Sequence, residues 1–272
     1  MSAIALSLRA PLEARLEVEG LAPDRLAALS ASAIERLPVW FGGRQAHLGD
    51  VFHVRGGGEA RVRVEGLLSR VDGIGAGMAG GELLVIGDAG ARVGAGMSGG
   101  RLDVEGSVSD DAGLAMSGGV LRVAGDAGDR LGAATPGASK GMSGGEIVVA
   151  GAAGADAAAR ARRGLVVVCG PVGDQAGRAM IAGSLIAFGH VNGTPGRGSK
   201  RGSIVALGGV DVPDTYRYAC TYEPPHVRLT LTYLRRRYGL HIEERAIAGA
   251  YRRYCGDAGE PGKGEILAWT GA

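Results

Sequence analysis

Apolar and polar residues alternate in a short run that recurs along the middle of the chain. Seven such runs each follow a glycine, here termed the anchor glycine, and the second and fourth residues after it are apolar in every run. Alternation with period two places both residues on one face of a β-strand. The sequence therefore predicts seven strands, whose inward-facing pairs are Leu83/Val85, Leu102/Val104, Leu121/Val123, Ile147/Val149, Val166/Val168, Leu185/Ala187 and Ile204/Ala206.

The anchor glycines recur with a nearly constant spacing. Successive anchors are 19 residues apart at every step except one, where Gly119 and Gly145 are 26 residues apart. A second glycine follows each anchor by six residues, and five of the six methionines precede an anchor by three. Such a period is typical of a solenoid, in which each coil buries its apolar face against its neighbours. The anchors are Gly81, Gly100, Gly119, Gly145, Gly164, Gly183 and Gly202.

We therefore predict an all-β solenoid, a right-handed parallel β-helix with coils of 19 residues. The right hand is expected because parallel crossover connections are almost always right-handed. The longer step predicts a loop around residues 131–139 that projects from one coil. Three regions follow from the pattern: an α/β N-terminal cap (1–47), the β-helix (48–212) and a helical C-terminal extension (213–272).

The two ends of the chain lack the repeat and predict other elements. Before the repeat, alternation predicts strands over 3–9, 12–18, 48–54 and 61–65, and an apolar stripe predicts one helix from Pro23 to Leu37. The aromatic segment 39–44 fits either a core plug or a partner contact. After the repeat, the sequence predicts helices over 226–238 and 243–254 and an extended tail over 262–269.

The outward positions of the strands become apolar toward the C-terminal end of the repeat. An early strand carries Arg101 and Asp103 there, whereas later strands carry aliphatic residues. A continuous apolar surface of this kind marks a covered face. Either the C-terminal helices or a partner protein covers it, and we expect both. The predicted partner interface consists of Val148, Leu165, Val167, Ile186 and Val205.

Composition excludes several classes of function. The net charge of +2 favours neither nucleic acid nor membranes. The three cysteines are far apart, which argues against a disulfide framework, a structural zinc site or an iron–sulfur cluster. The charged first 20 residues do not resemble a signal peptide, and no apolar run has a membrane-spanning length of about 20 residues. We expect a cytoplasmic protein.

Motifs for catalysis are weak. The segments 75–80 and 94–99 match a dinucleotide-binding glycine pattern, but they recur at the repeat period and no helical pattern follows them. The five histidines lack a metal-binding spacing, and no nucleophile motif is present. We predict no catalytic and no metal-ligating residues in this chain.

A set of basic residues recurs at equivalent coil positions. Arg162 and Arg163 precede Lys200 and Arg201 by two coils, and Arg178 lies between them in sequence. At about 4.8 Å per coil, the two pairs would be roughly 10 Å apart along one edge. These residues could bind an extended polyanion. The alternative is a solvated edge that prevents edge-to-edge pairing of strands.

The chain resembles the C subunit of formylmethanofuran dehydrogenase. The features that carry the resemblance are the repeated Gly-Met-Ser-Gly-Gly corners, the segment Leu48–Phe52 and the closing segments Tyr254–Asp257 and Gly262–Leu267. The resemblance covers nearly the whole chain. A similar coil occurs in the C-terminal domain of the large glutamate synthase subunit. Relatives occur in tungsten or molybdenum complexes of methanogenic archaea and in a formyltransferase/hydrolase complex of methylotrophic bacteria.

The resemblance implies a scaffold subunit that binds no cofactor firmly. The chemistry would belong to amidohydrolase-type and formyltransferase partners, where zinc and a methanofuran-type cofactor are expected. The glutamate-rich tail of that cofactor would be a ligand for the five basic residues. Because only Lys140 and Lys200 supply lysines at the coil corners, the composition suggests a GC-rich genome and favours the bacterial complex. The archaeal complex and a glutamate-synthase-type structural subunit remain the alternatives.

Overall fold

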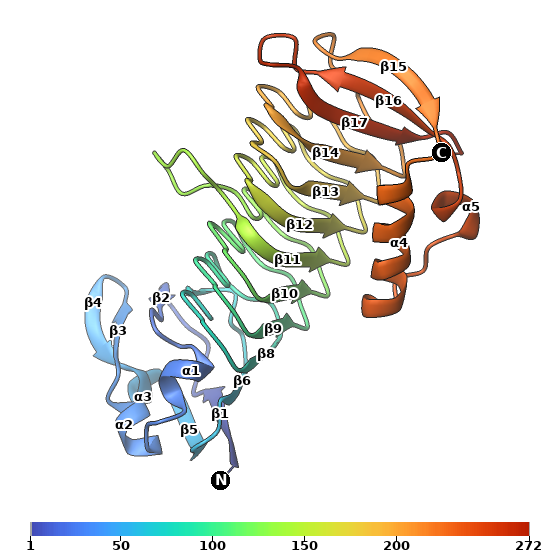
Figure 1. The fold of residues 1–272 in the computed structure, drawn as a ribbon. Coiled ribbons are helices and arrows are strands. Elements are labelled where there is room, and N and C mark those ends of the chain that lie inside the picture. Colours follow the sequence, from blue (N-terminus) through green and yellow to red (C-terminus); the bar gives the residue numbers. More distant parts are fainter. Residues whose placement is uncertain (1, 272) are drawn as a thin grey trace.

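The computed structural model describes residues 2–271, and most of its strands belong to one large sheet. This sheet has 13 strands in the order β15-β16-β17-β14-β13-β12-β11-β10-β9-β8-β6-β1-β5. Figure 1 shows its strands stacked along the length of the molecule, with few helices at the two ends. The predicted all-β class is confirmed in this form, a mostly-β chain with a large mixed sheet.

The centre of the large sheet consists of the strands that the repeat predicts. All seven are present, preceded by the predicted strand at 61–65, and each pairs in parallel with the next one along the chain. Equivalent residues of the repeat are register partners, as Leu83 is of Leu102. These strands are β6 (Arg61–Glu65), β8 (Glu82–Ile86), β9 (Arg101–Val104), β10 (Val120–Val123), β11 (Ser143–Val149), β12 (Arg163–Val168), β13 (Ser184–Ala187) and β14 (Arg201–Ala206).

Each repeat also contacts its neighbours at a second position. A row of single parallel bridges joins Leu68, Ala89, Val108, Ala127, Ala153, Val172, Val191 and Val210 in succession. The five repeat methionines are buried in the core with these residues, each at most 1 % exposed. A Cβ on Gly100, where φ is +79°, would lie 2.5 Å from Met78 Cε and 2.8 Å from a backbone oxygen. Glycine is required there because the neighbouring coil passes too closely for a side chain.

The longer repeat step forms the predicted projecting loop between β10 and β11 (Figure 1). Its exposed part is shorter than predicted. Leu131 and Ala133 remain buried in the core, whereas residues 135–137 and 139–140 are exposed. The insertion therefore leaves the parallel pairing of β10 with β11 intact.

The N-terminal region builds a second sheet and also extends the first. Strand β1 (Ser2–Leu8) joins the large sheet between β6 and β5 (Phe52–Gly57). The four-stranded sheet contains β4 (Arg44–His47), β3 (Pro38–Phe41), β2 (Leu16–Glu17) and β7 (Val71–Asp72), beside helices α1 (Pro23–Leu26), α2 (Ala31–Glu35) and α3 (Leu48–Val51).

Two N-terminal predictions were wrong in detail. The predicted single helix is two, because the Ser30 side chain accepts a hydrogen bond from the Ala33 N–H and begins α2 as its N-cap. The predicted strand 48–54 begins with α3, where His47 and Asp50 form a capping box. In the aromatic segment, Val39 is buried in the core but Trp40 is 52 % exposed. That segment thus has both a core residue and an exposed one.

The C-terminal region covers one end and one face of the stack. It comprises β15 (Arg217–Tyr222), α4 (Pro225–Tyr238), α5 (Glu244–Ile247), β16 (Tyr251–Gly256) and β17 (Lys263–Trp269). The first predicted helix and the extended tail are confirmed, the tail pairing in parallel with β14 as the next strand of the stack. The second predicted helix is wrong. It ends after one turn, because residues from Tyr251 onward pair with both β17 and β15.

Candidate functional site

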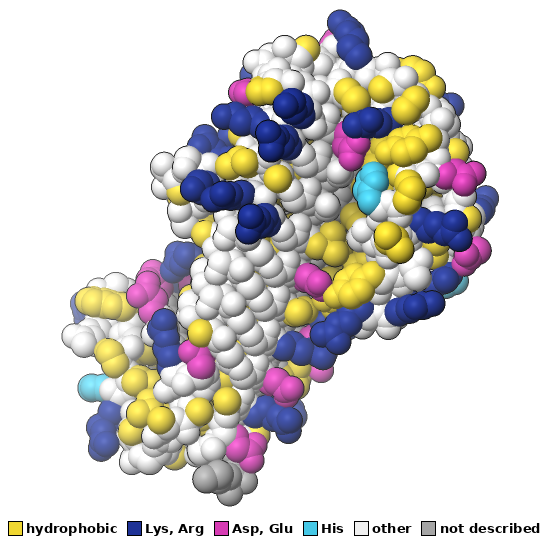
Figure 2. All heavy atoms as spheres, viewed as in Figure 1, with side chains coloured by type: hydrophobic (Ala, Val, Ile, Leu, Met, Phe, Trp, Pro, Cys, Tyr) yellow, Lys and Arg dark blue, Asp and Glu magenta, His cyan; other side chains and the backbone are white. Residues whose placement is uncertain are grey.

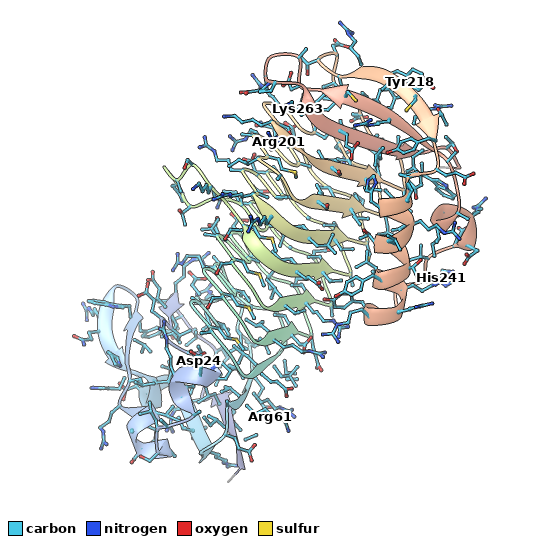
Figure 3. The ribbon with its side chains drawn as sticks, viewed as in Figure 1. Asp24, Arg61, Arg201, Tyr218, His241 and Lys263 are labelled. Carbon is cyan, nitrogen blue, oxygen red and sulfur yellow. The ribbon has the colours of Figure 1, made fainter. Side chains whose placement is uncertain are left out.

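The predicted basic residues gather at one edge of the stack. Arg163 and Arg201 begin β12 and β14, each preceded by another exposed cation, Arg162 or Lys200. The structure adds Lys263, the first residue of β17 and the register partner of Arg201. Figure 3 shows Arg201 and Lys263 at the same end of neighbouring strands. We call Arg162, Arg163, Lys200, Arg201 and Lys263 the basic stripe.

The basic stripe carries positive charge on five exposed side chains. Among residues 2–271, none of its five members forms an ion pair within 4.0 Å. A shallow pocket of about 310 Å³ lies among Lys200, Arg201 and Lys263, with Ile181 and Pro261 as its apolar lining. Figure 2 shows Lys and Arg side chains concentrated at this side of the late strands. Positive charge concentrated on one surface attracts anions.

Arg178 has a different environment from the basic stripe. Its Nε donates to Asp156 Oδ1 at 2.6 Å, and this hydrogen bond raises the pKa of the guanidinium. It faces a pocket of about 170 Å³ under the projecting loop, together with Arg130 and Arg160. Because Asp156 already neutralises it, Arg178 is not available to a ligand in the way that the stripe residues are.

Arg178 belongs instead to a row of charged residues at the turns of neighbouring repeats, which the sequence did not predict. Non-glycine residues with positive φ recur at one corner of successive coils, among them Asp111 (+66°), Arg130 (+61°) and Asp156 (+59°). Arg130 binds Asp111 through two hydrogen bonds of 2.7 and 2.9 Å. Carboxylates nearby accept backbone N–H groups of the next coil, as Asp129 does from Ala155. This row joins neighbouring repeats.

The predicted partner interface lies under the chain's own C-terminal segment. Val148, Val167, Ile186 and Val205 are at most 5 % exposed, and Leu165 is partly buried. They pack against helix α4 in a second hydrophobic cluster, to which the helix contributes Val227, Leu231 and Leu234. The C-terminal segment is thus one of the covers that the sequence allowed. Contact of these five residues with a partner stays a prediction.

The C-terminal end of helix α4 is fixed on the sheet by a carboxylate from strand β11. Glu146 of β11 accepts a hydrogen bond of 2.8 Å from the Tyr233 hydroxyl and a short one from Tyr238. Burial, and then the hydrogen bond to Glu146, raise the pKa of the Tyr238 hydroxyl. The Tyr238 ring also lies 5.8 Å from the Arg122 guanidinium, within cation–π range. The helix therefore has a defined position on the stack.

Within residues 2–271, His, Cys, Asp and Glu side chains form no group of three or more that could hold a metal ion. In the part of the chain that the structure describes, every helix is too short or too polar to cross a membrane.

Comparisons with known proteins identify relatives. No family model matches the chain. It is 33 % identical over 98 residues to the C subunit of molybdenum-containing formylmethanofuran dehydrogenase 1 from Methanosarcina barkeri, which is 34 % of this chain and 33 % of the relative. It is 34 % identical over 88 residues to the C subunit of the formyltransferase/hydrolase complex Fhc from Methylorubrum extorquens, which is 32 % and 33 % of the two chains. The matched stretches thus span about a third of the length of both curated relatives.

A solved structure extends the match to nearly the full length. A chain in the crystal structure of the formyltransferase/hydrolase complex FhcABCD from Methylorubrum extorquens, in complex with methylofuran, superposes with a TM-score of 0.86. The sequences are 33 % identical, and the match covers 97 % of this chain and 98 % of that one. On this evidence, the chain belongs to the family of C subunits found in formylmethanofuran dehydrogenases and formyltransferase/hydrolase complexes.

Proposed function

We propose that the chain is a non-catalytic scaffold subunit of a formyltransferase/hydrolase complex. The complex would transfer the formyl group from formyl-tetrahydromethanopterin to methanofuran (methylofuran) and release formate, during one-carbon (formaldehyde) oxidation in the cytoplasm of a methylotroph. The observation that carries the proposal is the match over 97 % of the chain to a component of FhcABCD. A scaffold role also agrees with charged groups that are used to join coils rather than to form a reactive cluster.

We propose a right-handed parallel β-helix as the architecture of the scaffold. Two features support it: the run of parallel strands from β6 to β14 and the second row of bridges on the same repeat. The regions 1–47, 48–212 and 213–272 would be the cap, the β-helix and the extension. Strand β1 shows that the cap also contributes to the large sheet.

The partners in this proposal are an amidohydrolase-type subunit and a formyltransferase subunit. They would hold the zinc and the methanofuran-type cofactor, while this chain binds neither firmly. The setting of the relative FhcABCD, a complex of several subunits, supports a hetero-oligomer. The Methanosarcina relative supports the second candidate, a subunit of an archaeal-type molybdenum or tungsten dehydrogenase.

We further propose that the basic stripe binds the glutamate-rich tail of the cofactor. Its four exposed cations on and beside β12 and β14 were predicted from the repeat, and the neighbouring Lys263 lengthens the row. Arg163→Glu combined with Arg201→Glu should weaken cofactor binding by the complex at least tenfold, and added salt should weaken binding by the wild type. Arg44→Glu, a change at an exposed arginine of β4, is the matched control. Unchanged cofactor affinity in the double variant would reject the stripe as a binding site.

The proposed function is tested by purifying the tagged chain from its native host. Mass spectrometry identifies the proteins that accompany it, and each fraction is assayed for formyl transfer and formate release. We expect formyltransferase and amidohydrolase chains to accompany the activity, and the isolated chain to be inactive. Activity of the isolated chain would contradict the scaffold role. Co-purification with molybdenum- or tungsten-containing subunits would favour the archaeal-type complex.

A further inference from the structure

Helix α4 has apolar residues on two opposite faces. Val227, Leu231 and Leu234 pack against the outer face of the sheet. Leu229 precedes Leu231 by two residues, which places it roughly 200° around the helix from the buried face. Leu229 is 72 % exposed and Tyr233, one turn later, is 41 % exposed. Figure 2 shows hydrophobic side chains on the surface around α4 (Figure 1). Leu229 and Tyr233, which we call the apolar pair, thus remain exposed on the helix although its other face is buried.

The charges on α4 are all of one sign. The helix contains four arginines and a histidine, and no Asp or Glu. Arg235 pairs with Glu244 at 2.7 Å. Within residues 2–271, no carboxylate lies within 4.0 Å of Arg228, Arg236 or Arg237. In the part of the chain that the structure describes, three exposed arginines therefore flank the apolar pair without an acidic partner.

The stability of the helix explains only part of this arrangement. Cations in the last turn interact favourably with the helix dipole, which accounts for Arg235, Arg236 and Arg237. Arg228 lies near the N-terminal end, where a cation opposes the dipole, and the first turn contains no acid to offset it. An exposed Leu229 also contributes nothing to the core. These two residues are therefore unexplained by folding and need another account.

We propose that this outward face of α4 docks a partner protein subunit whose contact surface is apolar and rimmed by Asp and Glu side chains. The inference rests on the proposed function, in which the chain works in a hetero-oligomer, and it names the surface and the chemistry of the partner. Arginine and tyrosine are enriched among the residues that dominate binding energy in protein interfaces, whereas lysine, which α4 lacks, is depleted. Complementary carboxylates would select this partner over neutral surfaces.

The helix is well positioned for docking before the partner arrives. Its buried face and its two tyrosine contacts with Glu146 fix it on β11, so docking would order few additional groups. A preorganised surface loses less conformational entropy on binding than a flexible one. Leu229 would enter an apolar depression of the partner, and Arg228 and Arg236 would meet carboxylates at its rim.

The first test replaces exposed side chains of α4 in the full chain, tagged and purified from the native host. Leu229→Asp should reduce the amount of co-purified partner subunits at least tenfold. Arg228→Glu combined with Arg236→Glu should also reduce this amount. Leu67→Asp is the matched control, because Leu67 is similarly exposed at 68 % but lies on the loop after β6. Thermal unfolding of the isolated chains should stay close to that of the wild type, because all these sites are exposed.

The second test does not depend on the variants. Hydroxyl-radical labelling of Leu229 and Tyr233 should be several-fold weaker in the intact wild-type assembly than in the isolated chain, while Leu67 stays equally reactive. If the assembly forms but both α4 side chains remain fully reactive, or if Leu229→Asp assembles normally, the docking surface is wrong and the proposed function stands. If the wild-type chain purifies alone, both are wrong.

Discussion

Two glycines in the same repeat allow the free-energy cost of a positive φ to be measured separately from the cost of a steric clash. Gly96 and Gly100 both have positive φ, at +67° and +79°. A Cβ on Gly96 would have no atom within 4 Å, and the equivalent position in the next coil is Ala115 with φ of +55°. A Cβ on Gly100 would meet Met78 Cε at 2.5 Å and backbone atoms at 2.8 and 2.9 Å. Only the second site is sterically closed.

The expected magnitudes follow from these contacts. A left-handed conformation costs an alanine about 1–2 kcal/mol, partly offset by about 0.4–1 kcal/mol because alanine restricts the unfolded chain. Gly96→Ala should therefore lower the free energy of unfolding by roughly 0–1.6 kcal/mol on these two terms. Gly100→Ala carries the same terms and adds about 1–3 kcal/mol for overpacking, since a neighbouring backbone cannot move aside.

The assay is urea unfolding of the purified chain, followed by far-UV circular dichroism for both variants and the wild type. The predicted quantity is the difference between the two variants, about 1–3 kcal/mol, with Gly100→Ala the less stable. Gly80→Ala provides a baseline, because Gly80 has neither a positive φ nor an atom within 4 Å of its added Cβ. Equal costs at Gly96 and Gly100 would refute the view that the anchor glycines are required by coil-to-coil contact.

Three further predictions concern the C-terminal region. Leu231→Ala should lower the free energy of unfolding by about 2–5 kcal/mol, whereas Leu229→Ala should change it by less than about 0.5 kcal/mol, because only Leu231 is fully buried. Glu146→Ala should cost about 1–3 kcal/mol in urea unfolding, since it leaves two tyrosine hydroxyls without their acceptor. Burial tends to raise the pKa of Asp257, but the N–H groups of Gly198 and another glycine outweigh it and hold the pKa below its ordinary value. A lowered pKa means that the stabilisation is present above the unfolded pKa of about 4 and is lost as pH falls below it, so Asp257→Asn should flatten the acid limb of a plot of Tm against pH.

The repeat made the centre of the fold predictable from sequence. Each coil uses the same corners and the same inward positions, so register follows from spacing alone, as it does for Leu83 and Leu102. Outside the repeat this information is missing. Residues 251–254 were predicted as the end of a helix, but pairing with strands on both sides decided their conformation. Tertiary pairing overrode the local pattern there.

The basic stripe was likewise only partly predictable from the sequence. Repeat spacing placed Arg163 and Arg201 along one edge, but it gave no position for Lys263, which enters the row through the C-terminal tail. Nor did spacing reveal that Arg178 is paired with Asp156, since the two lie on neighbouring coils 22 residues apart. The sequence indicated that an apolar outer stripe must be covered and offered the C-terminal helices as a cover, which α4 provides. It did not give the position of the helix on the sheet. Pairing and coverage of this kind depend on the path of segments that have no repeat.

The outer face of the large sheet changes its chemistry along the stack, and this change determines where contacts can form. On the early strands the outward charges neutralise one another, with Arg61 paired to Glu82 at 2.9 Å and Arg101 paired to Asp103. Water can cover such a surface, so it requires no partner. On the later strands the aliphatic face is tolerable only under α4, and this cover is what turns Leu229 and its flanking arginines outward. Because each strand of the sheet adds about 4.8 Å, the positions of α4 and of the basic stripe along the sheet are set by the order of the strands rather than by flexible linkers. Strands stacked in this way would hold a partner and an anionic ligand at a fixed separation, which is what the proposed scaffold role requires.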